Sequence, residues 1–322
     1  MRAAYVETAN PSDPLAALVL GDRPEPATPE GWTRVRVRAA SLNHHDLWSL
    51  QGVGLPAERM PMILGTDAAG TTEDGREVLV HAVIATDGWT GDETLDPRRT
   101  LLSELHQGTL AKWVAVPDRN LVDKPASLSF EEASCVPTAW LTAYRMLTRD
   151  SGLGAGPGTV LVQGASGGVT SAAIALGAAL GHRVWATART GAKRDLALEL
   201  GAEQAFEPGA RLPERVDAVI ETVGEATWAH SLKSLRPGGT VVVSGATSGA
   251  GPRTELNRVF FLQLRIIGST MGTREELEAL LGLLESSGVR PRIGQVLALD
   301  AVADGLAAMN AGDLRGKIVV QP

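Results

Sequence analysis

A turn of small side chains in the middle of the chain has the clearest chemical potential. Its residues are Gly164, Ala165, Ser166, Gly167, Gly168 and Val169. Glycine lets the backbone come close to a pyrophosphate, and the free N–H groups and dipole of a following helix favour the negative charge. The turn therefore predicts dinucleotide binding, provided that a strand precedes it and a helix follows it.

The neighbouring residues predict both of these elements. Thr159–Gln163 is a short apolar run with β-branched residues, and small or apolar residues recur at helical spacing from Val169 to Leu180. Similar patterns then alternate, with strands expected at 183–188, 216–221, 240–244 and 265–269 and helices at 193–200 and 227–235. Apolar strands separated by helices indicate an α/β domain whose parallel sheet is buried on both faces.

The end of the second expected strand indicates which dinucleotide is bound. In NAD-binding proteins an acidic residue about 20 residues beyond the glycine turn binds the ribose 2′-hydroxyl. Here Ala188 stands at that place, directly after Thr187, and the cations Arg189 and Lys193 follow. Cations and hydroxyls without a carboxylate suit a 2′-phosphate, because Arg offers a forked set of donors. We therefore expect NADPH; the alternative is that Arg189 and Lys193 only solvate the start of the next helix.

The segments on either side of this α/β core have other patterns. Residues 1–120 are mostly β, with strands expected at 2–7, 33–40, 77–82 and 109–116. Residues 86–108 are polar and turn-rich, and we interpret them as a surface excursion that borders a cleft. The tail predicts helices at 275–286 and 301–310 and strands at 295–299 and 317–321. The sequence leaves open on which domain this tail packs.

Composition excludes several classes of function. A chain of 322 residues predicts two domains, and a net charge of −7 gives no electrostatic reason to expect a nucleic acid as partner. The single cysteine, Cys135, rules out an intrachain disulfide and a cysteine zinc cage. There is no layout typical of a signal peptide at the start and no apolar run of membrane-spanning length. These features favour a soluble, cytoplasmic protein without a membrane partner.

Six segments in order along the chain resemble the medium-chain dehydrogenase/reductase superfamily, and most of all its zinc-independent quinone and enone reductases. They are Ala40–Trp48, Met62–Gly70, Trp140–Leu147, Val160–Val169, Leu235–Gly249 and Gly316–Val320. The resemblance implies an α/β fold, in which a doubly wound Rossmann sheet is joined to a β-rich GroES-like (chaperonin-10-like) catalytic domain. It places the GroES-like domain at 1–122, the NADPH-binding Rossmann domain at 123–270, and a segment completing the Rossmann edge and the catalytic domain at 271–322. The cofactor is expected in the cleft between the domains.

The resemblance also bears on the metal of the zinc-dependent relatives. Asn43 stands in place of their first Cys, Thr66 followed by Asp67 replaces their His-Glu pair, and Thr138 replaces their second Cys. Because Zn²⁺ prefers thiolate and imidazole ligands, amide and hydroxyl groups are poor substitutes. We therefore expect no metal.

Further cofactor contacts are implied by the resemblance alone. They are His44, Thr142, Val223, Gly224, Gly245, Thr270 and Lys317, of which His44 and Lys317 are expected at a phosphate and Gly245 and Thr270 near the nicotinamide. Thr170 takes the place of the last glycine of the fingerprint, so the turn is expected to be slightly open while binding survives.

Without a metal, side chains must polarise the acceptor. Asn43 can donate from its amide, and His45 stands where zinc alcohol dehydrogenases place a substrate-facing hydroxyl, so that its imidazole can donate a proton near neutral pH. The alternative for His45 is a structural role. Thr66, Asp67 and Thr138 are expected to line the former metal pocket.

Three hypotheses follow. The first is a zinc-independent, NADPH-dependent oxidoreductase that transfers hydride to a conjugated enone or quinone and forms a homodimer. The second is an NADPH-dependent carbonyl reductase or alcohol dehydrogenase that uses His45. The third is a non-catalytic NADPH-binding protein. Related enoyl reductases often carry a Tyr in a Q-G-x-Y-P stretch; Gly54 at that position weakens a fatty enoyl-thioester reductase reading without excluding it.

Overall fold

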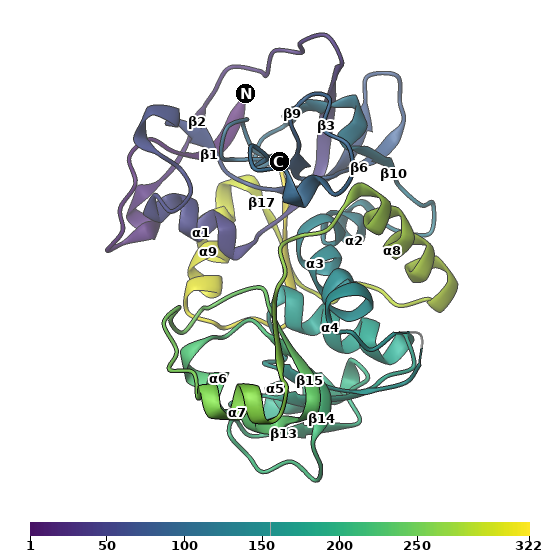
Figure 1. Cartoon of the computed structure of the whole chain (residues 1–322). Coiled ribbons are helices and arrows are strands. Elements are labelled where there is room, and N and C mark those ends of the chain that lie inside the picture. Colours follow the sequence, from purple (N-terminus) through teal and green to yellow (C-terminus); the bar gives the residue numbers. More distant parts are fainter. Residues whose placement is uncertain (155) are drawn as a thin grey trace. The chain divides into compact units, whose positions relative to one another are not determined.

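The computed structural model of the chain describes residues 1–154 and 156–322. These residues form two compact units, and Figure 1 shows their elements coloured along the sequence. Unit 1 consists of Met1–Ala139, Gly272–Ser286 and Arg290–Pro322, and unit 2 consists of Trp140–Met271 and Ser287–Val289. Unit 1 thus extends past residue 122, where the sequence places the end of the first domain, as far as Ala139. None of the described helices is long and apolar enough to cross a membrane.

Unit 2 is built on a six-stranded sheet in which each pair of neighbouring strands is parallel. The strand order is β13 (Gln204–Phe206), β12 (Arg183–Thr187), β11 (Thr159–Gln163), β14 (Val216–Glu221), β15 (Leu235–Val243) and β16 (Arg265–Gly268). The direction of winding reverses at β11, and α/β sheets bind ligands beyond the carboxyl ends of their strands at such a point. The expected α/β fold with a doubly wound parallel sheet is confirmed.

The helices of unit 2 alternate with its strands along the chain. They are α3 (Leu141–Arg145), α4 (Gly168–Ala179), α5 (Gly191–Glu199), α6 (Glu225–Ser234) and α7 (Leu256–Phe261), with a π-helical turn at Met146–Asp150. Small residues let α4 approach the sheet closely, since a Cβ on Gly177 would lie 2.8 Å from Val184 Cγ2. The turn before α4 is thus held between a fully buried strand and a largely buried helix.

Unit 1 is mainly antiparallel β. Its large sheet has the order β10 (Leu121–Asp123), β6 (Glu77–Val80), β5 (Asp67–Thr72), β3 (Trp32–Ser41), β18 (Lys317–Gln321) and β17 (Ile293–Ala298), with β9 (Trp113–Pro117) also paired to β3. In β3, Val35 and Val37 are buried while Arg36 and Arg38 are exposed, as the alternating sequence predicts. The smaller sheets join β2 (Leu18–Asp22), β1 (Arg2–Val6) and β4 (Met62–Ile63), and β7 (Val83–Ile84) with β8 (Thr100–Leu101).

The C-terminal tail contributes both of its strands to unit 1. Strand β17 pairs with β18, and β18 pairs with β3. Within the described part of the chain, residues 271–322 add no strand to the sheet of unit 2, whose outer strands are β13 and β16. The expected completion of the Rossmann edge by this segment is therefore not observed, because its strands find partners in unit 1.

The α-helices of unit 1 are α1 (His44–Gln51), α2 (Phe130–Ser134), α8 (Arg274–Ser287) and α9 (Val302–Asn310). A π-helical turn spans Val136–Trp140; its last residue, like the last residue of α8, clusters with unit 2. Single 3-10 turns occupy Pro14–Ala17, Ala57–Arg59, Glu93–Leu95, Asp118–Asn120 and Leu299–Ala301. Helix α1 begins directly after β3, so that the residues preceding it lie at the end of the central strand.

Candidate functional site

The glycine turn of unit 2 has the geometry of a dinucleotide turn. Gly164 follows β11 with a φ of +95°, a backbone conformation that side chains with a Cβ rarely adopt. Its N–H donates to Thr187 Oγ1 at 3.3 Å, which connects the turn to the end of β12. Gly167 is the N-cap of α4, and the N–H groups of the first turn of a helix have no intrahelical partner. These N–H groups are available for an anion.

Thr170 replaces the expected glycine without disturbing this turn. Its side chain is 5% exposed, and its hydroxyl accepts from the N–H of Gly167 and donates to the carbonyl oxygen of Gly167, both at 3.1 Å. The hydroxyl therefore caps α4 from inside the helix. It also uses one N–H group that would otherwise face a pyrophosphate.

Most of the expected cofactor residues lie at one edge of the unit 2 sheet. Because all six strands are parallel, the residues that follow their carboxyl ends meet at the same edge. These residues are Thr187 and Arg189 at β12, the turn Gly164–Val169 after β11, Val223 and Gly224 after β14, Gly245 after β15 and Thr270 after β16. Thr142 is on α3, and Lys193 is in the first turn of α5. His44 and Lys317 belong to unit 1.

The expected 2′-phosphate contact, Arg189, is open to solvent. Its side chain has no ion pair with any residue that the structure describes, whereas Ala188 before it is buried. The neighbouring Arg194 is used internally: its guanidinium donates to the carbonyl oxygen of Ala188 at 3.1 Å and lies 3.5 Å from Glu207. Arg189 is thus a free cation at the end of β12.

Strand register gathers the expected catalytic residues of unit 1. Ser41, at the end of β3, pairs with Asp67 on β5 and with Val319 on β18. Asn43 follows β3, Thr66 precedes β5, and Lys317 begins β18. Thr138, in the π-helical turn, completes the group through a contact of 3.0 Å between its Oγ1 and Thr66 Oγ1. We call Asn43, Thr66, Asp67, Thr138 and Lys317 the polar cluster.

A buried ammonium group lies inside the polar cluster. Lys317 is 3% exposed, and its Nζ donates to Asn43 Oδ1 at 2.7 Å and to the carbonyl oxygen of Leu42 at 2.8 Å. It also lies 3.4 Å from Asp67 Oδ2. The three hydrogens of the ammonium are matched by these three acceptors. Lys317, which the sequence places at a cofactor phosphate, is held by partners within unit 1.

The amide of Asn43 is oriented by the same contacts. Its Nδ2 donates to Asp67 Oδ2 at 2.8 Å and to Thr66 Oγ1 at 3.1 Å, while its Oδ1 accepts from Lys317. Both amide hydrogens are therefore used inside the polar cluster. The structure thus differs from the expectation that Asn43 donates to the acceptor; the amide instead connects the ammonium to the Thr66 hydroxyl.

The donor set of the polar cluster does not fit a catalytic zinc ion. It offers one amide, two hydroxyls and one carboxylate, whereas Zn²⁺ prefers thiolate and imidazole. Asp67 Oδ1 is buried without a hydrogen-bond partner and is the one free anionic ligand atom here. The Lys317 ammonium at the other oxygen of this carboxylate already balances its charge, so a second cation would be repelled.

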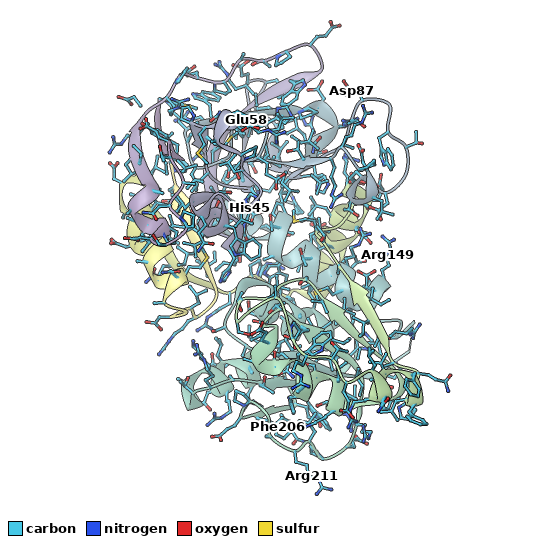
Figure 2. All side chains as sticks on the ribbon, turned by 60° about the vertical axis from the view of Figure 1, so that its left-hand side comes forward. His45, Glu58, Asp87, Arg149, Phe206 and Arg211 are labelled. Atoms are coloured by element: carbon cyan, nitrogen blue, oxygen red, sulfur yellow. The ribbon has the colours of Figure 1, made fainter. Side chains whose placement is uncertain are left out.

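Both ring nitrogens of His45 contact residues of the excursion at 86–108. It lies on α1 among the side chains of unit 1 (Figure 2). Its Nε2 lies 3.2 Å from Glu104 Oε1 and its Nδ1 lies 3.3 Å from Ser103 Oγ. Burial alone would raise the pKa of Glu104, but hydrogen bonds from His45 and from the Leu101 N–H, with the charge of His45, lower it below its ordinary value. Sequence reasoning missed Glu104 and Ser103, which lie almost sixty residues away from His45.

Two neighbours of His45 have defined roles. Asp46 accepts from the N–H of Asn43 at 2.8 Å and from the N–H of Gly65 at 2.9 Å, so it braces the two loops that carry the polar cluster. Burial raises the pKa of Asp46. Burial also lowers the pKa of His44, and the charge of Lys317 adds to the effect. His44 is therefore neutral at pH 7.

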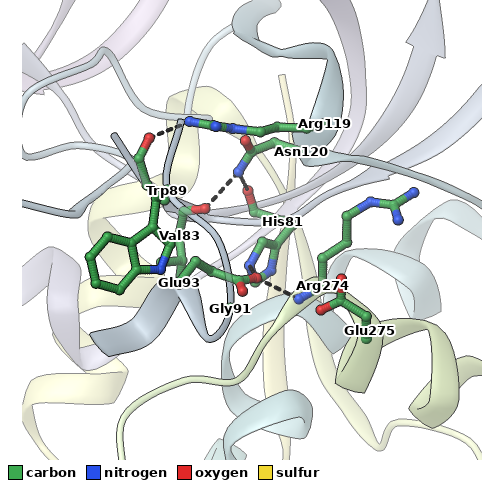
Figure 3. A pocket seen from close by; sticks show the side chains of 10 residues that line it. His81, Val83, Trp89, Gly91, Glu93, Arg119, Asn120, Arg274 and Glu275 are labelled. Carbon is green, nitrogen blue, oxygen red and sulfur yellow. Dashed lines mark hydrogen bonds and ion pairs between the residues drawn. The ribbon is translucent and has the colours of Figure 1, made fainter. Parts of the chain in front are cut away.

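A separate cavity of about 470 Å³ lies elsewhere in unit 1 (Figure 3). Trp89, Gly91 and Glu93 of the excursion line it together with His81 and Arg274, and no residue of the polar cluster does. His81 Nε2 lies 3.0 Å from Glu93 Oε1, which also accepts from the N–H of Arg274 at 2.6 Å. Part of the excursion thus borders a cavity, as expected, while another part holds His45.

Comparison with known proteins gives the same family for both halves of the chain. A model of the alcohol dehydrogenase GroES-like domain matches residues 29–126, and a model of the zinc-binding dehydrogenases matches residues 168–286. Acryloyl-coenzyme A reductase of Metallosphaera sedula is 30% identical over 316 residues, which are 92% of this chain and 93% of that protein.

Solved structures agree over nearly the whole chain. A crystal structure of an NAD-dependent alcohol dehydrogenase is 33% identical, with a TM-score of 0.91 and 100% of both chains covered. The 2-octenoyl-CoA carboxylase reductase CinF, in complex with NADP and 2-octenoyl-CoA, is 26% identical, with a TM-score of 0.89, and the match covers 99% of this chain and 87% of that one. With its parallel nucleotide-type sheet and its GroES-like unit, this chain belongs to the medium-chain dehydrogenase/reductase superfamily and is an oxidoreductase.

Proposed function

We propose that this protein is a zinc-independent, NADPH-dependent reductase that transfers hydride to a C=C bond conjugated with a carbonyl group, as in an enone or a quinone. The observation that carries the proposal is the Lys317 ammonium bound to Asn43 and Asp67, at the place where zinc-dependent relatives would hold their metal. A medium-chain reductase built in this way must polarise its acceptor with hydrogen bonds and a fixed charge.

The charge that develops in the reaction favours a conjugated acceptor. Hydride addition to an isolated carbonyl places a full negative charge on one oxygen, which a Lewis-acidic metal stabilises strongly. Addition to a conjugated C=C bond produces an enolate, whose charge is delocalised and needs weaker stabilisation. The similarity to acryloyl-coenzyme A reductase, whose name denotes the reduction of a conjugated thioester, supports this class of acceptor for the present chain.

We assign the polarising role to the path from Lys317 through Asn43 to the two threonines. The ammonium holds the amide oxygen, the amide donates to Thr66, and Thr66 Oγ1 meets Thr138 Oγ1 at 3.0 Å. In a chain of hydrogen bonds each donor strengthens the next. Thr138 is the partly exposed member of this path, so its hydroxyl is the group that we place at the acceptor oxygen.

We assign the cofactor to unit 2 and its 2′-phosphate to Arg189. The N–H groups that open α4 receive the pyrophosphate, and bound NADPH supplies the hydride. The free Arg189 and the absence of a carboxylate at Ala188 support NADPH over NADH, in agreement with the NADP held by CinF. The similarity to an NAD-dependent alcohol dehydrogenase makes the direct comparison of the two cofactors necessary.

The test is NADPH oxidation by the purified protein with a 1,4-quinone, an enone and a simple aldehyde, before and after dialysis against a chelator. We expect turnover with the first two acceptors, little with the aldehyde, and no loss after dialysis. Turnover restricted to the aldehyde, or activity that depends on a stoichiometric zinc ion, would contradict the proposal. NADPH binding without turnover of any acceptor would favour a non-catalytic role.

We also propose that the protein is a homodimer. The outer strand β16 and the adjacent helix α7 carry exposed apolar residues, among them Phe261, which is 76% exposed. Exposed apolar groups of this size mark contact surfaces. Light scattering that gives the mass of one chain at micromolar concentration would contradict the dimer.

A further inference from the structure

A continuous row of buried polar side chains lies within unit 2, near the edge of its sheet at which the expected cofactor residues meet. It runs from β12 through β11 and α6 to β14 and consists of Thr187, Gln163, Ser231 and Glu221, which we call the buried relay. Their relative exposures are 1%, 0%, 0% and 0%. Burial of an amide and a carboxylate is costly unless each is hydrogen-bonded, so such a row needs a complete set of partners.

Each hydrogen bond of the buried relay has one direction. Ser231 Oγ donates to Glu221 Oε2 at 2.6 Å. Ser231 Oγ then accepts from Gln163 Nε2 at 3.0 Å, which turns Gln163 Oε1 toward Thr187. Thr187 Oγ1 donates to this oxygen at 2.7 Å and accepts from the N–H of Gly164 at 3.3 Å. The row thus begins at the glycine turn and ends at Glu221.

A histidine confirms the orientation of the amide in the middle. His230 Nε2 lies 2.9 Å from the carbonyl oxygen of Ala210 and must donate to it. Gln163 Nε2 lies 2.9 Å from His230 Nδ1, so the second hydrogen of the amide also points toward α6. Both amide hydrogens of Gln163 are directed toward α6, so its oxygen has no other orientation.

The far end of the buried relay fixes a second turn. Glu221 Oε1 accepts from the N–H of Val223 at 2.8 Å and from the N–H of Gly224 at 3.1 Å. Gly224 has a φ of +91°, and a Cβ there would lie 2.3 Å from the carbonyl oxygen of Gly249. The backbone of this turn therefore has little freedom while Glu221 holds it.

One end of the row is the glycine turn, to which the proposed function assigns the pyrophosphate, and the other end is the Val223–Gly224 turn, which the family resemblance places at the cofactor. We propose that Thr187, Gln163, Ser231 and Glu221 are positioning residues, which keep the glycine turn and the Val223–Gly224 turn in register so that both contact one dinucleotide. This inference rests on the proposed NADPH site. It also changes the role of Thr187: its hydroxyl is buried and used twice within the protein, so it acts on the cofactor through Gly164 and does not contact it.

The test compares matched variants of the full-length protein by equilibrium binding of NADPH and NADH. Thr187→Val removes one hydroxyl without changing shape, and Ser231→Ala removes another. Each leaves buried groups unpaired, and we expect each to raise the Kd of both cofactors about 10-fold. Thr187→Ser, which keeps the hydroxyl, should restore tight binding. Ser234→Ala is the control on α6, because that hydroxyl only donates to the carbonyl oxygen of His230 at 2.8 Å.

The NADPH affinity of a double variant shows whether the four side chains act as one unit or each act locally. If the row acts as one unit, Thr187→Val combined with Ser231→Ala should bind NADPH about as well as either single variant, since the row is already broken. Full additivity, or wild-type affinity in both single variants, would overturn the inference. Failure of the wild-type protein to bind NADPH would instead contradict the proposed function, on which the inference depends. If Ser231→Ala does not fold, the Thr187→Val and Thr187→Ser pair decides the question.

Discussion

At the scale of single residues, the central feature of the polar cluster is the buried carboxylate of Asp67, together with the groups that compensate its charge. Asp67 accepts from Ser41 and Asn43 and faces the Lys317 ammonium. Removal of one member of a buried ion pair leaves the other charge uncompensated, at a cost of about 3–5 kcal/mol. The cluster is therefore both a stabilising feature of unit 1 and the source of the fixed positive charge at the proposed site.

We expect Lys317→Met to lower both stability and turnover. Turnover should fall about 100-fold, the range found when one group that stabilises a developing oxyanion is removed. Combination with Asp67→Asn should restore much of the free energy of unfolding, because no buried charge is then left alone, but it should not restore turnover. Urea unfolding and steady-state rates of the two variants measure these effects. Recovery of activity in the double variant would exclude the ammonium from catalysis.

Arg189→Ala tests the choice between the two cofactors. A charged hydrogen bond to a phosphate is worth about 1.5–3 kcal/mol, so the Kd of NADPH should rise about 10- to 100-fold while that of NADH stays within about twofold. Arg194→Ala is the matched control, because its guanidinium bonds within the protein and should not discriminate between the cofactors. Titration calorimetry gives the four affinities. Equal losses of both cofactors in Arg189→Ala would leave the 2′-phosphate without its assigned partner.

At the scale of elements, helix α4 begins with Thr170 in place of the glycine expected from the dinucleotide fingerprint, and the threonine hydroxyl bonds to the backbone of Gly167. Thr170→Val keeps the shape of the side chain and removes the hydroxyl that caps the helix at Gly167. Loss of a cap costs about 1 kcal/mol, so the free energy of unfolding should fall by that amount. NADPH affinity should not decrease, since the N–H of Gly167 becomes available. A loss of binding larger than the loss of stability would show that the hydroxyl itself contacts the cofactor.

The pattern of apolar residues predicts a strand or helix well where one face of the element, or the whole element, is buried. The expected strands at 216–221 and 317–321 have those bounds in the structure, and the glycine turn lies between strand and helix as expected. Strand β15 begins earlier than expected, because Leu235 pairs with Val216 across a bulge. Helix α1 was not predicted, since its polar start lacks helical periodicity and depends on Asp46 accepting from the N–H of Asn43.

The site residues are less predictable than the elements that carry them. The polar cluster combines residues that are far apart in the sequence. Strand register brings residues 43, 66, 67 and 317 together, and Thr138 joins them from a π-helical turn through its contact with Thr66. The sequence motifs named these residues but could not predict their hydrogen bonds. In the structure Lys317, expected at a cofactor phosphate, bonds to Leu42 and Asn43 instead, and both amide hydrogens of Asn43 are bonded within the cluster. The partners of His45 come from an irregular loop, for which no periodic signal exists.

At the scale of the whole molecule, protonation of half-buried histidines contributes to the response to acid. Burial lowers the pKa of His44, His106 and His182 below the ordinary value of 6.5. Below that pH the unfolded chain binds protons that the folded protein does not, so unfolding takes up protons and the free energy of unfolding falls as the pH decreases. The lowered pKa of Glu104 acts in the same direction at lower pH, whereas the raised pKa of Asp46 opposes it.

We therefore expect a lower urea midpoint at about pH 5.5 than at about pH 7.5, and a shallower pH dependence in His106→Gln, which removes one of the three groups. Circular dichroism at the two pH values measures both midpoints. An unchanged or higher midpoint in acid would mean that Asp46, whose pKa is raised by burial, outweighs the histidines.

The pairing of β18 with β3 has a consequence for the order in which the molecule is made. These strands lie more than 270 residues apart, and all of unit 2 is synthesised between them. On the ribosome, Asn43 and Asp67 leave the exit tunnel early, and they have no contact with the Lys317 ammonium until residue 317 has also left the tunnel. The parallel sheet of unit 2 has by then been translated in full, so the polar cluster is completed last. A nascent chain stalled before β18 has the whole sheet of unit 2 but lacks the strand that joins β3 to β17 in unit 1.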